Sequence, residues 1–337
     1  MDPLRMGIVG SGRLGGFHAN KAAAHEKVEL VGIYDINREN AQAAAEKFNC
    51  RVFDSLETLA ETVQAAVIAV PSVLHCQIAR VLLEKGVSLL IEKPMTVNST
   101  EAAELMALAK KSNAKIMVGH TEQYNPVWES AKQLLGSGVP CFIDARRTSG
   151  YTFRSTDIGV ILDLMIHDLE LVLSAIPEEI ARIDAFGFST IGGFEDFAQA
   201  RMTFANGTVA NLTASRVEHE AVRRMGIWSA YETKIIDFAS RTATTYIALP
   251  DVRGGKFAPE HVGFEEIAKI QPTFMQAEFQ KDEVSFPAVD ALTLEMADFV
   301  EMVLHQTPPK VPAVHAARAI EVAEKIMAAM KSVVQRV

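Results

Sequence analysis

Short apolar runs alternate with amphipathic stretches over the first third of the chain. The apolar runs are "RMGIVG", "VELVGIYD", "AAVIAVP", "VSLLIEKP" and "KIMVGH". Helical patterns such as "RENAQAAAEKFN", "VLHCQIARVLLEKG" and "NSTEAAELMALAKKSN" lie between them. Strands that are apolar throughout and are separated by helices are typical of a parallel sheet with both faces covered. The pattern therefore predicts a doubly wound α/β domain over residues 1–120.

Residues 121–337 change to an alternation of apolar and polar positions. "DFAQARMTF" and "TVANLTASRV" are typical of strands, and Asn206 and Gly207 between them indicate a hairpin. The alternation continues through "RRMGIWSA" and "TKIIDFASRTATTYIAL". A helical pattern then returns in "LTLEMADFVEMVLHQ" and "PAVHAARAIEVAEKIMAAMKSVV". We therefore expect an α+β domain with a mostly antiparallel sheet, one face of which is covered by helices.

Composition limits the classes of function. The 337 residues are 49% hydrophobic and 22% charged, which is enough apolar material for a large core. A formal net charge of -9 without a basic run argues against nucleic acid. No window approaches the roughly 20 apolar residues of a membrane helix, so we expect no membrane partner. The three cysteines lack zinc or CxxC spacing and the N-terminus lacks a signal-peptide layout, so we expect a cytoplasmic protein.

A glycine-rich turn follows the first predicted strand in "GIVGSGRLGGFHANK". Gly10, Gly12 and Gly15 form G-x-G-x-x-G, which lets a backbone approach a pyrophosphate at a helix N-terminus. A tight turn that binds nothing would show the same glycines. Asp35 ends the second strand, where a carboxylate can bind the ribose hydroxyls of NAD. Its charge would repel the 2′-phosphate of NADP, so the sequence predicts NAD, a preference that the nearby Arg38 moderates.

Two further strands bring polar residues to the same edge of the sheet. Ligands of such sheets lie outside the carboxyl ends of the strands, so Pro71 and Ser72 should pass beside the cofactor. Lys93 ends the next strand, and Pro94 favours an extended conformation there, which gives the lysine a defined direction. The alternatives are a solvated lysine and, for His75, an ordinary polar residue at a helix start.

The stretch "GVILDLMIHDLELVL" carries Asp163 and His167 among apolar residues. Four residues apart, they share one face of a helix. One interpretation is a catalytic pair in which Asp163 orients His167, whose ordinary pKa of about 6.5 suits a general base. The alternatives are a buried structural pair and, less strongly, a metal site completed by His120 or Glu122. Asp168 lies about 100° around the helix from His167 and is not included.

In this order, "GSGRLG", "YD", "AVPSVLH", "EKP" and "VGHTEQYNP" resemble the Gfo/Idh/MocA family of oxidoreductases, over essentially the whole chain. The resemblance implies a Rossmann domain joined to an α+β domain whose large open sheet mediates oligomers, here a homodimer or homotetramer. It also implies hydride transfer between a nicotinamide cofactor and a secondary alcohol of a sugar or cyclitol. Lys93 matches the EKP lysine at the reacting carbon, where a cis bond to Pro94 is common. Asp163 and His167 match D-x-x-x-H, with the histidine as the acid/base and the aspartate beside the substrate.

The motifs and the resemblance give one set of candidate site residues. The catalytic residues are Lys93, Asp163 and His167, and no metal is expected. The residues expected to contact NAD are Gly10, Ser11, Gly12, Arg13, Leu14, Asp35, Ile36, Val70, Pro71, Ser72, His75, Glu92, Lys93 and Gln123.

The substrate is the least determined part. "VGHTEQYNP" and "LDLMIHDLELVL" are most similar to members that act on nucleotide-linked amino sugars, which implies an activity like that of UDP-N-acetylglucosamine 3-dehydrogenase. The sequence has "TEQYNP" where "ERFNP" is common, which leaves the contacts of Gln123 and Tyr124 open. Oxidation of myo-inositol or a free sugar, and a non-catalytic NAD-binding sensor, are the alternatives. The residues that could grip an anionic substrate, or be merely solvated, are Arg154, Arg216, Arg223 and Arg224.

Overall fold

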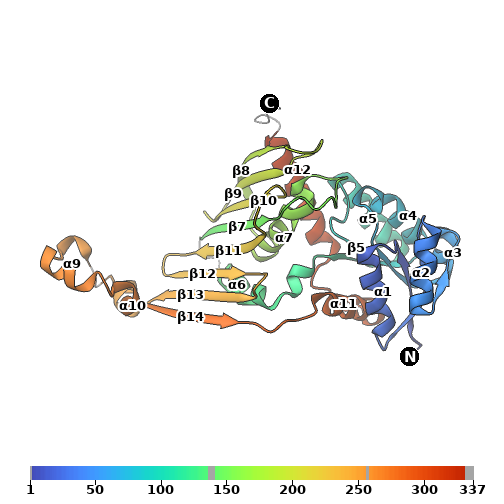
Figure 1. Cartoon of the computed structure of the whole chain (residues 1–337), viewed down its shortest axis with the longest axis horizontal. Coiled ribbons are helices and arrows are strands. Elements are labelled where there is room, and N and C mark those ends of the chain that lie inside the picture. The colour runs from blue at the N-terminus through green and yellow to red at the C-terminus, as the bar shows by residue number, and fades with distance from the viewer. Residues whose placement is uncertain (1, 136–140, 256–257, 331–337) are drawn as a thin grey trace.

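The computed structural model describes residues 2–135, 141–255 and 258–330 and contains two sheets (Figure 1). Sheet A is parallel, with the strand order β3-β2-β1-β4-β5-β6. Its strands are β1 (Leu4–Val9), β2 (Val28–Tyr34), β3 (Arg51–Val52), β4 (Ala65–Ile68), β5 (Ser88–Glu92) and β6 (Ile116–Gly119). This order is that of a Rossmann fold and confirms the doubly wound sheet expected from the sequence.

Helices cover both faces of sheet A. Successive side chains of a strand point to opposite faces, so Ile8 packs with α1, α2 and α11, whereas Val9 lies in a second core with α3, α4 and α5. Both cores consist of fully buried apolar residues, which explains why these strands are apolar throughout. These helices are α1 (Arg13–Ala24), α2 (Arg38–Phe48), α3 (Leu56–Thr62), α4 (His75–Glu84), α5 (Ser99–Ser112) and α11 (Ala291–His305).

Helix α11 comes from the end of the chain but packs under the first sheet. Its Met296, Phe299 and Val300 are buried in the same core as Met6 and Ile8 of β1. A domain boundary at residue 120 separates the two sheets. It assigns α11 to the second domain, although this helix packs on sheet A.

Sheet B has the strand order β14-β13-β12-β11-β7-β10-β9-β8, antiparallel except between β7 and β10. The mostly antiparallel sheet expected from the sequence is confirmed, and Asn206 and Gly207 form the turn between β9 and β10. Its strands are β7 (Phe142–Thr148), β8 (Ile180–Phe188), β9 (Phe197–Phe204), β10 (Val209–Ser215), β11 (Val222–Trp228), β12 (Glu232–Asp237), β13 (Thr242–Ala248) and β14 (Phe279–Ser285).

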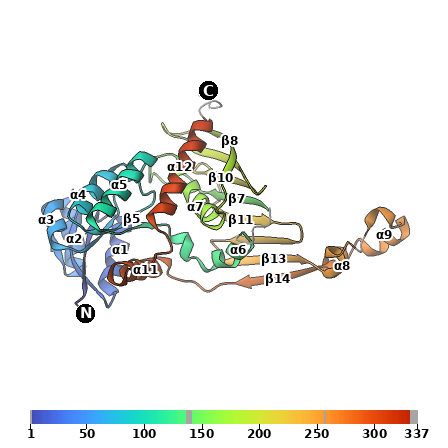
Figure 2. The same cartoon turned by 180° about the vertical axis from the view of Figure 1, so that it is seen from behind.

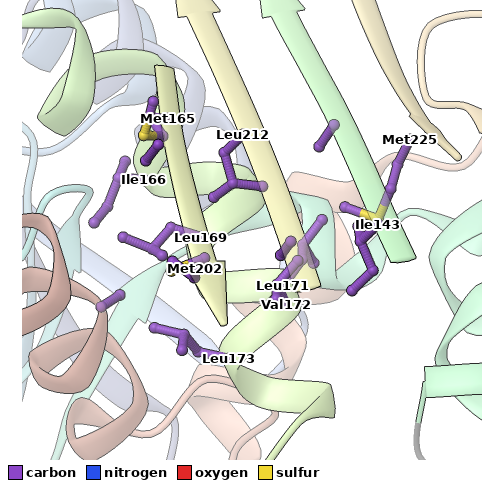
Figure 3. Packing of buried hydrophobic residues seen from close by; sticks show 14 of the residues in the cluster. Ile143, Met165, Ile166, Leu169, Leu171, Val172, Leu173, Met202, Leu212 and Met225 are labelled. Atoms are coloured by element: carbon purple, nitrogen blue, oxygen red, sulfur yellow. The ribbon is translucent and has the colours of Figure 1, made fainter. Parts of the chain in front are cut away.

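Three helices cover one face of sheet B. They are α6 (Pro126–Leu135), α7 (Ile166–Ala175) and α12 (Ala313–Met330). Leu169 and Val172 of α7 pack on Met202, Leu212 and other inward side chains of the strands (Figure 3). Short 3-10 segments connect other elements, namely η1 (Ser72–Leu74), η2 (Thr121–Tyr124) and η4 (Pro259–His261). None of the described helices is long and apolar enough to span a bilayer.

An arm projects from sheet B away from sheet A (Figures 1 and 2). It joins β13 to β14 through α8 (Pro250–Arg253), α9 (Phe264–Ile270) and α10 (Phe274–Glu278), in which no residue is buried. Neither the arm nor β14 was expected from the sequence. The sequence did not predict β14 because the strand lies at the edge of the sheet. Charged residues such as Lys281 and Glu283 stand there in place of alternating apolar residues.

Candidate active site

A cavity of about 590 Å³ lies where the carboxyl ends of the sheet A strands meet sheet B. Such a crevice is where ligands of doubly wound sheets bind. Nine of the predicted site residues line it: Gly12, Arg13, Leu14, Val70, Pro71, Glu92, Lys93, Asp163 and His167. The fold thus brings predicted cofactor-contacting residues of the first domain and Asp163 and His167 of the second domain to one cavity.

The glycine turn leaves room for a dinucleotide. Gly10 has φ +91°, and a Cβ on Gly15 would lie 1.8 Å from the Gly10 carbonyl oxygen, so α1 begins in direct contact with the turn. A Cβ on Gly12 would meet no atom within 4 Å. Gly12 also supplies no capping side chain, which leaves the first amide hydrogens of α1 available to an anion. These features fit the diphosphate of a dinucleotide cofactor.

Asp35 is held beside the same turn. Its Oδ2 accepts hydrogen bonds from the Ser11 amide (2.6 Å) and the Ser11 hydroxyl (2.8 Å), and its Oδ1 accepts one from the Asn37 amide (2.8 Å). A carboxylate can accept about four hydrogen bonds, so capacity remains for a ribose hydroxyl. Arg38, the residue that could attract a 2′-phosphate, donates instead to Asp54 (2.6 Å). This environment fits a ribose better than a ribose phosphate.

Lys93 reaches from the end of β5 to the second domain. Its Nζ donates to the carbonyl oxygen of Asp163 (2.7 Å) and to Asp163 Oδ1 (3.1 Å). An ammonium group has three donors, so one remains for an oxygen in the cavity. The bond between Lys93 and Pro94 is cis, as the resemblance suggested.

Asp163 does not orient His167, contrary to the interpretation from their spacing. Asp163 lies in a π-helical turn, η3 (Ile161–Met165), and its carboxylate is bound by Lys93. His167 Nδ1 is buried and has no partner among the described residues, and the residue lines the cavity. A buried pair between the two side chains is therefore also wrong. Turns of π-helix are frequent at functional sites.

The pKa of His167 lies well below its ordinary value. The main cause is burial, followed by the positive charges of Lys93 and Arg147. The further contributions of His120 and Arg223 act in the same direction. The imidazole is therefore neutral at physiological pH, and the ordinary pKa assumed from the sequence is wrong.

His120 lies edge-on to His167, with the ring centroids 6.3 Å apart. It is 2% exposed, and burial lowers its pKa to about 3, with a further contribution from Lys93. Within the described part of the chain, no group of three or more His, Cys, Asp or Glu side chains could hold a metal ion. His120 and Glu122 therefore do not complete a metal site with Asp163 and His167.

A buried hydrogen bond fixes the strand end that carries Lys93. Glu92 accepts a hydrogen bond from Nε2 of His18 in α1 (2.6 Å) and one from the Lys93 amide (3.3 Å). Burial opposes the charge of Glu92, but His18 and Lys93 hold its pKa below the ordinary value. His18 was not singled out from the sequence, and its place on the buried side of the first helix is the only signal there.

His75 and Gln123 do not line the cavity, and their assignment as cofactor contacts stays a prediction. His75 is 1% exposed, and its two ring nitrogens lie 2.8 Å from the Pro94 carbonyl and 3.0 Å from the Val70 carbonyl. It therefore joins the loops after β4 and β5. Ser72 is likewise buried, and Ile36 is fully open to solvent beside Asp35.

The side-chain hydrogen bonds of Gln123 all go to residues of the second domain. Its amide nitrogen donates to Glu170 (2.9 Å) and Ser174 (2.8 Å), and its oxygen accepts from Nε1 of Trp128 (3.1 Å). Burial raises the pKa of Glu170 to about 7. The neighbouring Tyr124 donates to Asp298 of α11 (2.5 Å), so the "QY" pair ties the two sheets together.

Arg147 is a cavity residue that the sequence reasoning missed. It donates twice to Asp168 (3.0 and 2.8 Å) and once to Glu122 (2.8 Å). Burial opposes its charge, but these two carboxylates raise the pKa of Arg147 above its ordinary value. Asp168, set aside because it points away from His167, thus holds an arginine in the cavity wall.

The four arginines considered for an anionic substrate occupy different environments. Arg216 lines the cavity but is 4% exposed and donates to Asp196 (2.8 Å). Arg154 and Arg223 also line the cavity, whereas Arg224 does not.

Residues 4–120 of the chain match the GFO/IDH/MocA "Oxidoreductase family, NAD-binding Rossmann fold", and residues 137–229 match the "GFO/IDH/MocA C-terminal domain". UDP-N-acetylglucosamine 3-dehydrogenase of Acidithiobacillus ferrooxidans is 34% identical over 336 residues, which is 100% of both chains. Inositol 2-dehydrogenase of Rhizobium meliloti is 25% identical over 230 residues, covering 63% of this chain and 69% of the relative.

A solved structure of the Acidithiobacillus ferrooxidans enzyme has the same fold. It superposes with a TM-score of 0.84 at 32% identity and covers 98% of this chain and 99% of its own. The similarity thus includes both sheets.

Proposed function

Because this chain belongs to the Gfo/Idh/MocA family of oxidoreductases, we propose that it is an NAD-dependent dehydrogenase that oxidises the 3-hydroxyl of UDP-N-acetylglucosamine. The whole-length similarity to an enzyme of that name supports the substrate. The observation that carries the proposal is the arrangement of the cavity. Lys93 and His167 line the same cavity, and so does Gly12 of the open glycine turn in the other domain.

The protein residues have separate tasks in the proposed reaction. When bound, NAD supplies the hydride acceptor. The free N–H donor of Lys93 binds the oxygen of the substrate alcohol and stabilises negative charge that develops on it. Asp163 holds Lys93 in place through two hydrogen bonds. Neutral His167 accepts the hydroxyl proton at Nε2.

NAD rather than NADP is the proposed cofactor. The free capacity of Asp35 and the engagement of Arg38 by Asp54 support this choice. Asp35→Ala should weaken NAD binding by about 1.5–3 kcal/mol, the value of a hydrogen bond to a charged group, and should narrow the preference over NADP. Titration of both cofactors into both proteins measures this, and tighter binding of NADP by the unaltered protein would overturn the choice.

Turnover with a small set of alcohols tests the function itself. We expect NADH formation with UDP-N-acetylglucosamine and a 3-keto product identifiable by mass spectrometry. Faster turnover of myo-inositol or a free sugar would favour the activity suggested by the inositol 2-dehydrogenase relative. Tight NAD binding without turnover of any alcohol would indicate a sensor.

We also propose that the protein forms a homodimer or homotetramer through the face of sheet B that α6, α7 and α12 leave open. Aromatic pairs on that face support this: Phe142 lies 5.6 Å from Trp228, and Phe188 stacks on Phe197 at 5.0 Å. A water-exposed sheet face rarely gathers such side chains. The three cysteines are free, consistent with the expectation of a cytoplasmic location, which stays a prediction.

A further inference from the structure

Two arginines on the sheet B side of the cavity have no carboxylate partner within the described ranges of the chain. Arg223 lies in β11, and Arg154 lies in the loop between β7 and η3. The other two arginines on this side, Arg147 and Arg216, are each neutralised by buried carboxylates. Positive charge in this wall therefore remains available at Arg223 and Arg154.

The strand register directs Arg223 into the cavity. Arg223 pairs with Arg147 across β11 and β7, so both side chains lie on the face of sheet B toward α7. The next residue, Arg224, pairs with Arg146 and lies on the opposite face. The charges of Arg147 and Arg223 both contribute to the lowered pKa of His167. Arg223 is therefore within electrostatic reach of the reaction centre.

The loop that carries Arg154 is anchored from beneath. Arg216 Nη1 donates to the carbonyls of Ser155 (3.3 Å) and Ile158 (3.0 Å), and its guanidinium lies 5.5 Å from the ring centre of Tyr151. The buried pair of Arg216 with Asp196 holds this arrangement. Arg154 is thus presented from a fixed loop although its own side chain is exposed.

We propose that Arg223, assisted by Arg154, binds the diphosphate of the nucleotide-sugar substrate and so selects nucleotide-linked over free sugars. This inference rests on the proposed function and names the residues that give it specificity. A guanidinium fork matches phosphate oxygens in a bidentate manner. The open space at Gly12, which fits the diphosphate of a dinucleotide cofactor, lies on the other domain. The two sites divide the cavity between cofactor and substrate.

Binding of UDP, measured by calorimetry, tests the inference without turnover. Arg223→Gln should weaken UDP binding about 10- to 100-fold, as expected when a hydrogen bond to a charged group is lost. The matched control is Arg224→Gln, which removes the same charge from the opposite face and should change UDP affinity less than about twofold. NAD affinity and melting temperature should be unchanged in both, because Arg223 lies on sheet B and the glycine turn follows a strand of sheet A.

The outcomes separate this inference from the proposed function. Wild-type turnover of UDP-N-acetylglucosamine with unchanged UDP affinity in Arg223→Gln would overturn the inference alone. In another outcome, UDP affinity falls in Arg223→Gln but not in Arg224→Gln, and the wild type does not turn over UDP-N-acetylglucosamine. That result would overturn the proposed dehydrogenase function and leave the inference about Arg223 intact. Equal losses of UDP affinity in both variants, or a loss of NAD affinity matching that for UDP, would also overturn the inference.

Discussion

At the scale of single residues, the site depends on which partner each charged group has. Asp163 is bound to Lys93 rather than to His167, and Nδ1 of His167 has no hydrogen-bond partner among the described residues. The ammonium is oriented, and the imidazole is kept neutral. This division suits an electrostatic role for Lys93 and proton acceptance by His167.

Replacing Lys93 or His167 should reduce turnover and spare cofactor binding. Lys93→Met keeps most of the stem and removes the charge, and His167→Asn keeps a polar group and removes the base. Each should lower kcat by about 100-fold or more, with combined losses that are less than additive. Stopped-flow and steady-state rates, with melting temperatures from the same preparations, measure this. A stable His167→Asn protein with full activity would contradict the assignment.

The lowered pKa of His167 predicts an unusual pH profile for alcohol oxidation. A general base works in its neutral form, and burial with Lys93 and Arg147 keeps His167 neutral well below its ordinary pKa. The value of kcat/KM should therefore stay constant as the pH falls through about 6.5 and decline only at lower pH. An acid limb centred at or above about 6.5 would show that the ring is not buried as described.

His120 should make stability depend on pH. Its pKa is about 3 in the folded protein and about 6.5 when unfolded. Between these values the unfolded chain binds the extra proton, so the free energy of unfolding falls as the pH is lowered, by about 1.4 kcal/mol per unit for this residue. His120→Asn should remove that part of the slope. Urea unfolding at about pH 6 and 5 compares the two proteins, and identical slopes would contradict the burial of this ring.

At the scale of elements, the first strand, turn and helix combine two different uses of glycine. Gly15 lets α1 contact the turn, because a side chain there would overlap the Gly10 carbonyl. Gly12 instead leaves open space above the helix N-terminus. The first is a requirement of the fold, and the second is a requirement of the ligand.

Alanine substitutions should separate these uses. Gly15→Ala should lower the melting temperature, because its Cβ would lie 1.8 Å from a backbone oxygen and the helix must shift. Gly12→Ala should leave the melting temperature unchanged but weaken NAD binding at least about 10-fold, since the methyl group occupies the space of the diphosphate. Gly16→Ala, also in open space, is the control for an added methyl group. Full NAD affinity in Gly12→Ala would place the cofactor elsewhere.

At the scale of the whole molecule, the cavity forms between the two domains, and each domain contributes one wall. Tyr124 and α11 tie the two parts together through Asp298, and the open face of sheet B lies away from the cavity. The proposed reaction and the proposed assembly therefore involve opposite faces of sheet B.

The assembly proposal predicts a specific loss of association. The Trp228 ring lies over Gly226 on the open face of sheet B and is 37% exposed. Trp228→Glu should convert dimers or tetramers to smaller species in light scattering at micromolar concentration, because a charge would be buried at the interface. Leu294→Glu, at a position on α11 that is 44% exposed, should leave the assembly unchanged. A monomeric wild-type protein would refute the proposal.

The sequence by itself predicted most of the elements and the glycine turn with Asp35 beside it. Continuous apolar runs, the glycine spacing and Asp35 depend on residues close together in the chain, and strand periodicity is a local property. For the same reason the sequence indicated the hairpin at Asn206 and Gly207 and the helical stretch of Asp163 and His167. It gave no sign of β14, because an exposed edge strand has little apolar alternation.

Only the tertiary structure decided which charged groups meet. Lys93 and Asp163 are 70 residues apart, and Arg147 is held by a carboxylate 21 residues away. Spacing along a helix suggested the pair of Asp163 and His167, but the Asp163 carboxylate binds the ammonium group of Lys93 instead. The sequence placed His75 at a helix start beside the cofactor. In the structure its ring nitrogens instead contact the carbonyl oxygens of Pro94 and Val70. Electrostatic and hydrogen-bond partners depend on distance in space, which a sequence pattern does not contain.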